Sequence, residues 1–244
     1  MSPSTEQVLG FWFSSPNVVA AEIASRQGYR NAVLDIEHGN FDLAALDRFI
    51  PFARQLGFKV MAKVLAPERS PIQQALDFGA DAVVIPHIQG EAHARQVAAY
   101  AKFPDSAAPG LRERSYAGGR TVRYQGPDEE FFARENAATH CLPMVETPGA
   151  LAEIEGILAL PTVDGVFVGP SDLSLRRGRG RYLRGDADWR DLEVIARAAK
   201  AAGKPWYMPA WTPVEREMSL HLGVAAMICT MEFGALHAGI EASQ

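Results

Sequence analysis

One alternation of short apolar runs and longer amphipathic segments is repeated eight times along this chain of 244 residues. The apolar runs are rich in Val, Ile and Phe and have the length of β-strands, and each is followed by apolar residues at helical spacing. The predicted strands are residues 8–13, 31–36, 59–64, 82–86, 141–145, 165–168, 204–208 and 225–230. Eight such units favour an α/β fold of the closed (β/α)₈ TIM-barrel type over an open doubly wound sheet, and the sequence contains no Gly-rich dinucleotide or Walker motif.

The segments between the strands carry helix-start signals. Residues 70–73 and 212–215 each combine a hydroxyl residue, a proline and a Gln or Glu, which predicts helices capped by Ser70 and Thr212. One interval is longer than the others, and it is predicted to hold a helix at 91–103, a Gly/Arg-rich loop at 109–127 and a short helix at 128–138. We therefore expect one TIM-barrel domain over residues 1–244, with a loop insertion at about 104–138.

Composition narrows the functional class. Lys and Arg total 24 against 29 Asp and Glu, so the formal net charge is -5 and the chain lacks the basic excess of nucleic-acid-binding or anionic-membrane-binding proteins. No stretch of about 18 apolar residues predicts a membrane helix, and the interpretation is a cytoplasmic protein. Cys141 and Cys229 lie inside apolar runs, which predicts buried reduced thiols.

Polar residues follow four of the predicted strands, at the barrel face where active sites of this fold lie. Glu146 and Asp172 are 26 residues apart, about one strand and helix, so neighbouring strands deliver both carboxylates to one rim. Two carboxylates suit Mg²⁺ or Mn²⁺, with water and substrate oxygens completing the coordination. The alternative is that Glu146 caps a helix and Asp172 forms a turn.

Two further strand ends carry candidates for proton transfer and charge stabilisation. Asp35 lies three residues before His38, where a carboxylate can orient the imidazole as a general base, although a surface histidine on a loop has the same pattern. Lys63 ends the third strand, where a lysine can stabilise an enolate or carboxylate or form a Schiff base. The residues alone leave these alternatives open.

At these strand ends the sequence resembles the HpcH/HpaI aldolase/citrate lyase family of metal-dependent pyruvate aldolases, over nearly the whole chain. The resemblance lies in segments 33–39, 79–86, 145–147 and 163–174. It implies a class II aldolase, of the 4-hydroxy-2-oxoheptanedioate or 2-dehydro-3-deoxyglucarate type. Such an enzyme cleaves a 4-hydroxy-2-oxo acid to pyruvate, or a related 2-oxo acid, and an aldehyde through a metal-stabilised enolate.

The resemblance also implies roles for individual residues. Glu146 and Asp172 would hold a divalent ion, Mg²⁺ or Mn²⁺ with Co²⁺ or Zn²⁺ as further candidates, while His38, oriented by Asp35, would transfer protons. The backbone N–H groups of Ser171 and Asp172, following Gly169, would seat the substrate carboxylate at a helix start. Trp12 would wall the pocket or pack in the barrel.

Assembly is a further expectation of the resemblance. It implies a homo-oligomer, a hexamer built as a trimer of dimers, in which the C-terminal helix after Glu232 is exchanged between subunits. A small 2-oxo acid is the expected partner, and neither nucleic acid nor membrane is expected.

Two departures from the family pattern leave the reaction open. Lys63 stands where cleaving members usually have an arginine, and Met144 stands where a glutamine is common. Arginines also gather in two loops that we expect on the catalytic side, with Arg114 and Arg120 as substrate-binding candidates. Concentrated arginine suits a second carboxylate or a phosphate-bearing acyl carrier, and solvated or inter-subunit charge is the alternative.

Three functional hypotheses follow from these observations. The leading one is the carbon–carbon lyase. The alternative is a citrate-synthase-like enzyme that joins an acetyl-CoA enolate to oxaloacetate on the same scaffold. The third is a metal-binding or structural barrel without activity.

Overall fold

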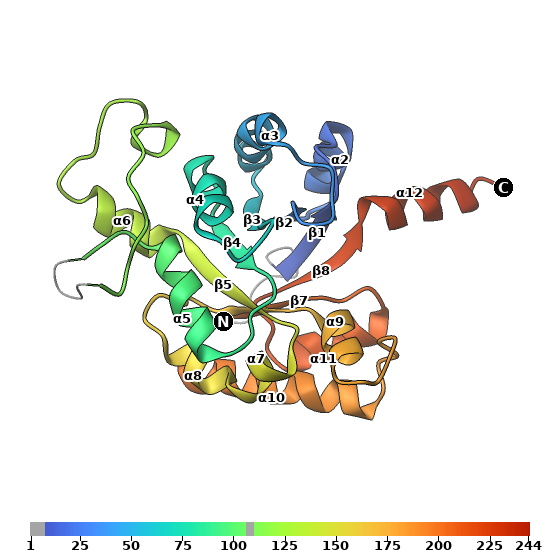
Figure 1. The fold of residues 1–244 in the computed structure, drawn as a ribbon. Helices are drawn as coiled ribbons and strands as arrows, with labels where there is room; N and C mark the ends of the chain where they lie inside the picture. Colours follow the sequence, from blue (N-terminus) through green and yellow to red (C-terminus); the bar gives the residue numbers. More distant parts are fainter. Residues whose placement is uncertain (1–7, 106–109) are drawn as a thin grey trace.

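A closed parallel barrel forms the centre of the computed structural model, which describes residues 8–105 and 110–244 (Figure 1). Within this part of the chain, eight parallel strands pair in chain order and β8 pairs with β1. The strands are β1 (Leu9–Phe13), β2 (Asn31–Asp35), β3 (Lys59–Lys63), β4 (Ala82–Ile85), β5 (His140–Val145), β6 (Val166–Val168), β7 (Trp206–Pro209) and β8 (Ala226–Met231). The predicted (β/α)₈ barrel is confirmed, because every predicted strand is present.

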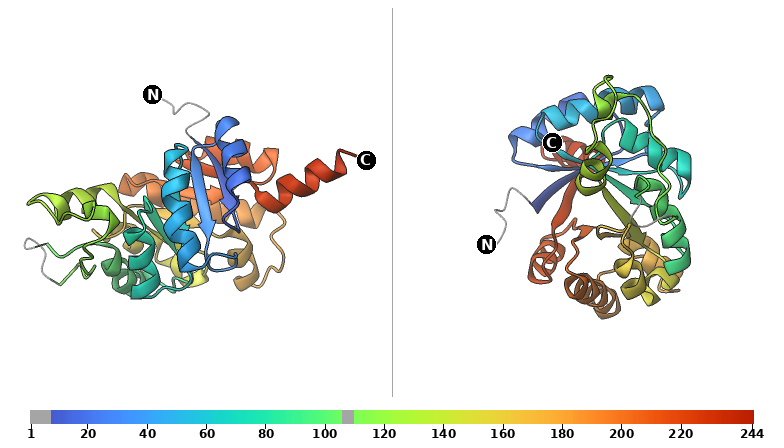
Figure 2. Two further views of the ribbon diagram at one scale, coloured as in Figure 1. Left: turned by 90° about the horizontal axis from the view of Figure 1, so that it is seen from above. Right: turned by 90° about the vertical axis from the view of Figure 1, so that its left-hand side faces the viewer.

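Helices surround the barrel and cover the outer face of its strands (Figure 2). They are α2 (Val18–Arg26), α3 (Leu43–Gln55), α4 (Arg69–Asp77), α5 (Glu91–Ala98), α6 (Phe131–Ala138), α7 (Pro148–Ala152), α8 (Ile154–Ala159), α9 (Pro170–Arg176), α10 (Asp186–Ala202), α11 (Pro213–His221) and α12 (Glu232–Glu241), with the 3₁₀ turns η1 (Ala99–Ala101) and η2 (Arg120–Val122). Unlike the helices around the barrel, α12 projects away from the molecule in both figures. No helix among the described residues combines the length and apolarity needed to span a bilayer.

Apolar side chains fill the barrel in two separate layers, as its alternating strand pattern requires. The inner layer includes Trp12, Met61, Leu142 and Phe167. The outer layer packs the strands against the helices. Cys141 is a buried free thiol, as is Cys229, and burial raises the pKa of both, so the expected inert thiols are confirmed.

Helix starts agree with the sequence at one site and differ at another. The Thr212 hydroxyl accepts a hydrogen bond from the Glu215 N–H, and the Glu215 carboxylate accepts one from the Thr212 N–H at 2.8 Å, so the predicted capping box is confirmed. The prediction of Ser70 as a cap is wrong, because α4 begins at Arg69 and its N-cap is Glu68. Pro71 is tolerated in this first turn, where backbone N–H groups have no partner within the helix.

The insertion joins η1 to β5, so it leaves and re-enters the barrel at the amino-terminal ends of the strands. It holds η2 and α6, with a small apolar cluster of Phe103, Val122 and Phe131. In Figure 1 this segment extends beyond the ring of helices. The insertion therefore builds outward from the end of the barrel opposite the carboxyl-terminal rim.

Candidate active site

A buried lysine lies between two carboxylates at the carboxyl ends of β2 and β3. Asp35 and Lys63 are the last residues of these strands and are paired in the strand register. Lys63 Nζ lies 3.1 Å from Asp35 Oδ1 and 2.5 Å from Glu37 Oε2, and all three side chains are less than a tenth exposed. Both carboxylates face the Lys63 Nζ, an arrangement that suits charge balance.

Asp35 is held by three donors, and the imidazole of His38 is not among them. Its Oδ2 accepts a hydrogen bond from Trp12 Nε1 at 3.2 Å, and its Oδ1 accepts from the His38 backbone N–H at 3.2 Å as well as from Lys63. The predicted orientation of the His38 ring by Asp35 is therefore wrong, because the turn brings the backbone N–H of His38, and not its side chain, to the carboxylate.

The His38 imidazole faces Glu37 and solvent. Its Nε2 lies 3.5 Å from Glu37 Oε2, and the side chain is 68% exposed. Burial opposes ionisation of Glu37, but Lys63, His38 and His87 together lower the pKa of Glu37. The carboxylate beside the exposed His38 imidazole is therefore that of Glu37, whereas the sequence predicted that of Asp35.

The two proposed metal ligands follow β5 and β6. Glu146 is 2% exposed, and its Oε1 accepts the His87 backbone N–H at 2.6 Å. Burial raises the pKa of Glu146, and the negative charge of Asp172 acts in the same direction. Two carboxylates that disfavour each other's ionisation at a shielded position are a donor set that a divalent cation stabilises. The residues present therefore fit a hard dication.

The close packing around Glu146 depends on Gly169, the residue before α9. A Cβ at Gly169 would lie 2.9 Å from Glu146 Cβ and 3.0 Å from its Oε2. Among the described residues no group of three or more His, Cys, Asp or Glu side chains could enclose an ion. Ser171 is exposed beside Asp172, in the first turn of α9.

His87, which the sequence analysis missed, lies between these two groups of side chains. It follows Pro86 at the end of β4 with φ of 58°, in the left-handed region. Its Nε2 lies 2.5 Å from Glu37 Oε1 and its Nδ1 lies 3.0 Å from Arg176 Nη2. The signal available in the sequence was its place after a strand, the same signal that identified the other candidates.

Comparison with known proteins identifies the family of this chain. The family model described as HpcH/HpaI aldolase/citrate lyase matches residues 8–228. The chain belongs to this family. A relative named 2-keto-3-deoxy-L-rhamnonate aldolase, from Klebsiella pneumoniae subsp. pneumoniae, is 30% identical over 229 residues, which are 93% of this chain and 84% of the relative. The HpcH/HpaI protein is therefore an enzyme of the lyase class.

Solved structures agree with the barrel. A family protein from Burkholderia cenocepacia J2315 has a TM-score of 0.88 and 24% identity, with 97% of this chain and 93% of the other covered. The citrate synthase SbnG has a TM-score of 0.84 and 21% identity, with 97% and 91% covered. At these identities the two structures establish the fold that this HpcH/HpaI chain shares with them.

The insertion arginines of this HpcH/HpaI protein do not line the rim. Arg114 is buried, its Nη2 lies 2.9 Å from Oδ1 of Asp77 at the last residue of α4, and its guanidinium stacks on Phe103. Arg120 Nη2 lies 2.6 Å from Asp47 Oδ1 on α3. The prediction that Arg114 and Arg120 bind substrate is therefore wrong for a single chain. The insertion follows a helix, so it lies at the amino-terminal ends of the strands, opposite the rim.

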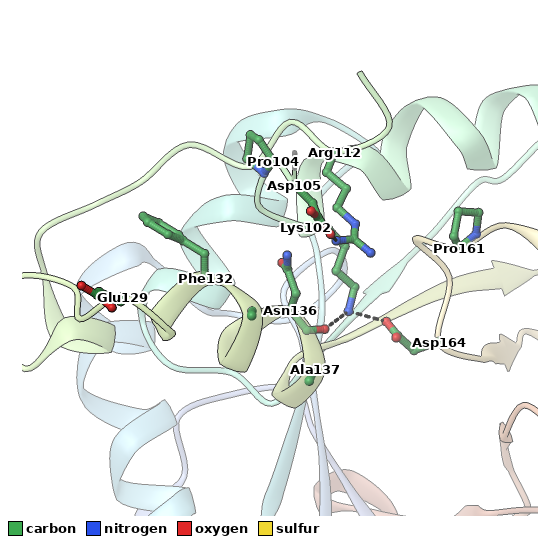
Figure 3. Close-up of a pocket in the computed structure, with 11 residues that line it drawn as sticks. Lys102, Pro104, Asp105, Arg112, Glu129, Phe132, Asn136, Ala137, Pro161 and Asp164 are labelled. Carbon is green, nitrogen blue, oxygen red and sulfur yellow. Dashed lines mark hydrogen bonds and ion pairs between the residues drawn. The ribbon is translucent and has the colours of Figure 1, made fainter. Parts of the chain in front are cut away.

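A cavity of about 590 Å³ lies on the insertion and not on the rim (Figure 3). Lys102 in this cavity donates to the carbonyls of Asn136 and Thr139 and lies 2.8 Å from Asp164 Oδ2. Lys102 and Asp164 precede β5 and β6, so the cavity opens at the amino-terminal ends of the strands. Its lysine is satisfied by structural contacts.

The second group of arginines follows α9, on the side of the rim. Arg177 and Arg179 form ion pairs with Asp191 of α10, at 3.2 and 2.6 Å. Arg184 lies 2.9 Å from Oε2 of the buried Glu215. Arg181 lines a cavity of about 420 Å³ together with Ser171 and Asp172. The ion pairs fasten this loop to the barrel, and Arg184 lines the same cavity as Arg181.

Proposed function

We propose that the protein is a metal-dependent aldolase that cleaves a 4-hydroxy-2-oxo acid to pyruvate, or a related 2-oxo acid, and an aldehyde. The observation that carries the proposal is the meeting of Glu146 and Asp172 at the same rim as the cluster of Asp35, Lys63 and Glu37. The names of its relatives favour a 2-keto-3-deoxy sugar acid as the first substrate to assay.

Glu146 and Asp172 are the proposed ligands of Mg²⁺ or Mn²⁺, with Co²⁺ and Zn²⁺ as further candidates. When bound, the ion supplies a Lewis acid that polarises the keto group of the substrate. Following the resemblance, the backbone N–H groups of Ser171 and Asp172, with Gly169 before them, receive the substrate carboxylate. The Trp12 ring supports Asp35 and walls the mouth of the barrel.

Proton transfer is assigned to His38, with Glu37 as its neighbouring carboxylate. In cleavage, the 4-hydroxyl gives up its proton, the bond between carbons 3 and 4 breaks, and the electron pair passes to carbon 3. Carbon 3 then takes a proton and becomes the methyl group of pyruvate. The His38 imidazole, open to solvent and 3.5 Å from Glu37, is placed to exchange protons with water during these steps. No oxidant or reductant enters the reaction.

Lys63 balances charge in this proposal and does not bind the substrate covalently. Its ammonium is occupied by Asp35 and Glu37, and it lowers the pKa of Glu37. A metal ion held by Glu146 and Asp172 would supply the positive charge that an enolate needs. This arrangement accounts for a lysine at a position where the family pattern has arginine.

The proposal for assembly is a homo-oligomer that covers α12. None of the residues of this helix is buried, and it exposes Phe233, Leu236 and Ile240. An exposed apolar helix that leaves the barrel is stabilised by packing on a second copy of the chain. Light scattering tests this directly: we expect a hexamer for the full chain and smaller species for a Leu236→Asp variant, whereas a monomeric full chain would refute the proposal.

Pyruvate release tests the proposed reaction. Metal-free protein is assayed on several 4-hydroxy-2-oxo acids, 2-keto-3-deoxy-L-rhamnonate included, before and after addition of Mg²⁺, Mn²⁺, Co²⁺ or Zn²⁺. We expect turnover that requires a metal and is lost in Glu146→Gln but kept in Glu155→Gln, an exposed glutamate of α8 that serves as the matched control.

The condensing alternative is measured with the same protein. Metal-loaded enzyme is mixed with acetyl-CoA and oxaloacetate, and free thiol is followed. Thiol release without pyruvate release from any hydroxy-oxo acid would replace aldol cleavage by condensation. Turnover that persists in full without metal would refute the assignment of Glu146 and Asp172.

A further inference from the structure

Four polar contacts of His87 connect the two halves of the rim. Its backbone N–H donates to Glu146, its ring Nδ1 lies 3.2 Å from Glu146 Oε1, and the ring also lies against Glu37 and Arg176. Glu37 follows β2 and is held by Lys63, and Arg176 ends α9, the helix that carries Asp172. His87, which follows β4, therefore contacts Glu37 beside His38 and the proposed metal ligand Glu146. It also contacts the helix that carries the other proposed ligand, Asp172.

The hydrogen-bond chemistry of the ring follows from its partners. Nδ1 of His87 lies 3.0 Å from Arg176 Nη2 and 3.2 Å from Glu146 Oε1. Nε2 lies 2.5 Å from Oε1 of the Glu37 carboxylate. The ring is thus held at both nitrogens, and its orientation is determined by residues from several different elements.

Holding the ring also holds the backbone of His87. A φ of 58° is unfavourable for a residue with a Cβ, although histidine and asparagine adopt it more often than most. In this conformation the N–H of His87 points at Glu146 Oε1, 2.6 Å away. That bond fixes one oxygen of a carboxylate that is almost fully buried. The ring contacts supply the stabilisation that keeps the N–H in place.

We propose that His87 is a positioning residue for the metal site: the bracket of Glu37, His87 and Arg176 fixes the Glu146 carboxylate in the orientation that binds the ion. The inference rests on the proposed function in taking Glu146 as a ligand. Lys63 contributes through Glu37, because the lysine pairs with Glu37 Oε2 and leaves Glu37 Oε1 to His87. A bidentate arginine in its place would compete for both oxygens.

Metal affinity is the measurement that tests the bracket. Mn²⁺ is titrated calorimetrically into metal-free wild type and variants, and the thermal shift produced by Mn²⁺ is measured in parallel. We expect His87→Ala to weaken Mn²⁺ binding about tenfold or more, the usual effect of removing a group that orients a ligand. His87→Asn, which tolerates positive φ and keeps a side-chain amide, should recover part of the affinity.

Two more variants separate positioning from a general structural role. Glu37→Leu leaves every residue on the metal side in place but removes the acceptor of the His87 ring, so it should also weaken Mn²⁺ binding. His93→Ala on α5 is the matched control, because the His93 ring accepts from the Gln89 N–H away from the ligands, and it should bind Mn²⁺ as the wild type does. Unfolding of the metal-free proteins by urea checks that each variant is folded.

Each outcome decides between the bracket and the proposed reaction. Wild-type Mn²⁺ affinity in folded His87→Ala or in folded Glu37→Leu overturns the bracket. A wild type that binds no Mn²⁺ at millimolar concentration overturns both the metal site and the bracket. A wild type that binds Mn²⁺ but releases no pyruvate overturns the proposed reaction, and the affinities of the variants still decide whether His87 positions Glu146.

Discussion

Replacing Lys63 by methionine tests the charge balance of the rim most directly. The variant keeps the length of the side chain but removes the ammonium that lies between Asp35 and Glu37. Both carboxylates are at most 9% exposed, so water screens their repulsion poorly. Removing one partner from a buried ion pair costs about 3–5 kcal/mol, whereas an exposed pair contributes at most about 1 kcal/mol.

The expected loss is measurable as a change in melting temperature. For a chain of this size, each kcal/mol corresponds to roughly 2–4 °C, so the Lys63→Met variant should melt roughly 6–20 °C below the wild type at neutral pH. Urea unfolding gives the free-energy difference itself. The matched control is Lys59→Met at the start of the same strand, because Lys59 forms no ion pair among the described residues, and it should cost less than about 1 kcal/mol.

The pH dependence of stability shows whether charge causes the loss in Lys63→Met. In the folded wild type the pKa of Glu37 is lowered, so its ionisation stabilises the fold above the ordinary pKa of 4.5 and that stability is lost as the pH falls through the folded pKa. In Lys63→Met burial remains without the opposing ammonium, so the pKa of Glu37 rises and its protonation relieves the repulsion. The stability difference between wild type and variant should therefore narrow from about pH 7.5 to about pH 5.

Two results would refute this reasoning. A Lys63→Met protein as stable as the wild type at neutral pH would mean that the ammonium does not neutralise the two carboxylates. A stability loss that is the same at both pH values would mean that the loss comes from packing and not from charge.

Three further predictions concern other parts of the barrel. Gly169→Ala should keep the fold, because φ at Gly169 is -104°, a value that alanine adopts. It should weaken Mn²⁺ binding about tenfold, since the new Cβ would lie 2.9 Å from Glu146 Cβ. Calorimetric titration checks this prediction, and unchanged affinity would contradict the close packing. Arg114→Ala should lose roughly 2–4 kcal/mol of stability by leaving Asp77 without its partner, yet kcat should be unchanged because Arg114 lies away from the rim; a lower kcat in the folded variant would return Arg114 to the site. Borohydride reduction in the presence of pyruvate should leave no adduct on Lys63 by mass spectrometry, because its Nζ is occupied by Asp35 and Glu37, and an adduct would restore the Schiff-base alternative.

The strand ends could be predicted from the sequence because the barrel fixes their direction. Once the alternation gives eight parallel strands, residues at their carboxyl ends must meet at one rim, and Asp35, Lys63, Glu146 and Asp172 all lie there. The same rule applies to the insertion arginines. They follow a helix, so they lie at the amino-terminal ends of the strands and not at the rim. Counting arginines in a loop does not indicate at which end of the barrel the loop lies.

Atomic pairing within the rim could not be predicted from spacing. Asp35 and His38 are three residues apart, and that spacing is satisfied by a turn in which the backbone N–H, not the imidazole, reaches the carboxylate. His87 depends on a positive φ and on side chains from two distant elements, Glu37 and Arg176. Such contacts arise from tertiary packing, and a local pattern does not encode them.

The charges of the rim together explain why a dication suits this site. The connected groups comprise four carboxylates, those of Asp35, Glu37, Glu146 and Asp172, and two cations, Lys63 and Arg176. Two negative charges are then in excess at a shielded position, and one divalent ion balances them. Lys63 is essential to this balance, because without it the excess rises to three charges and a dication no longer neutralises the rim.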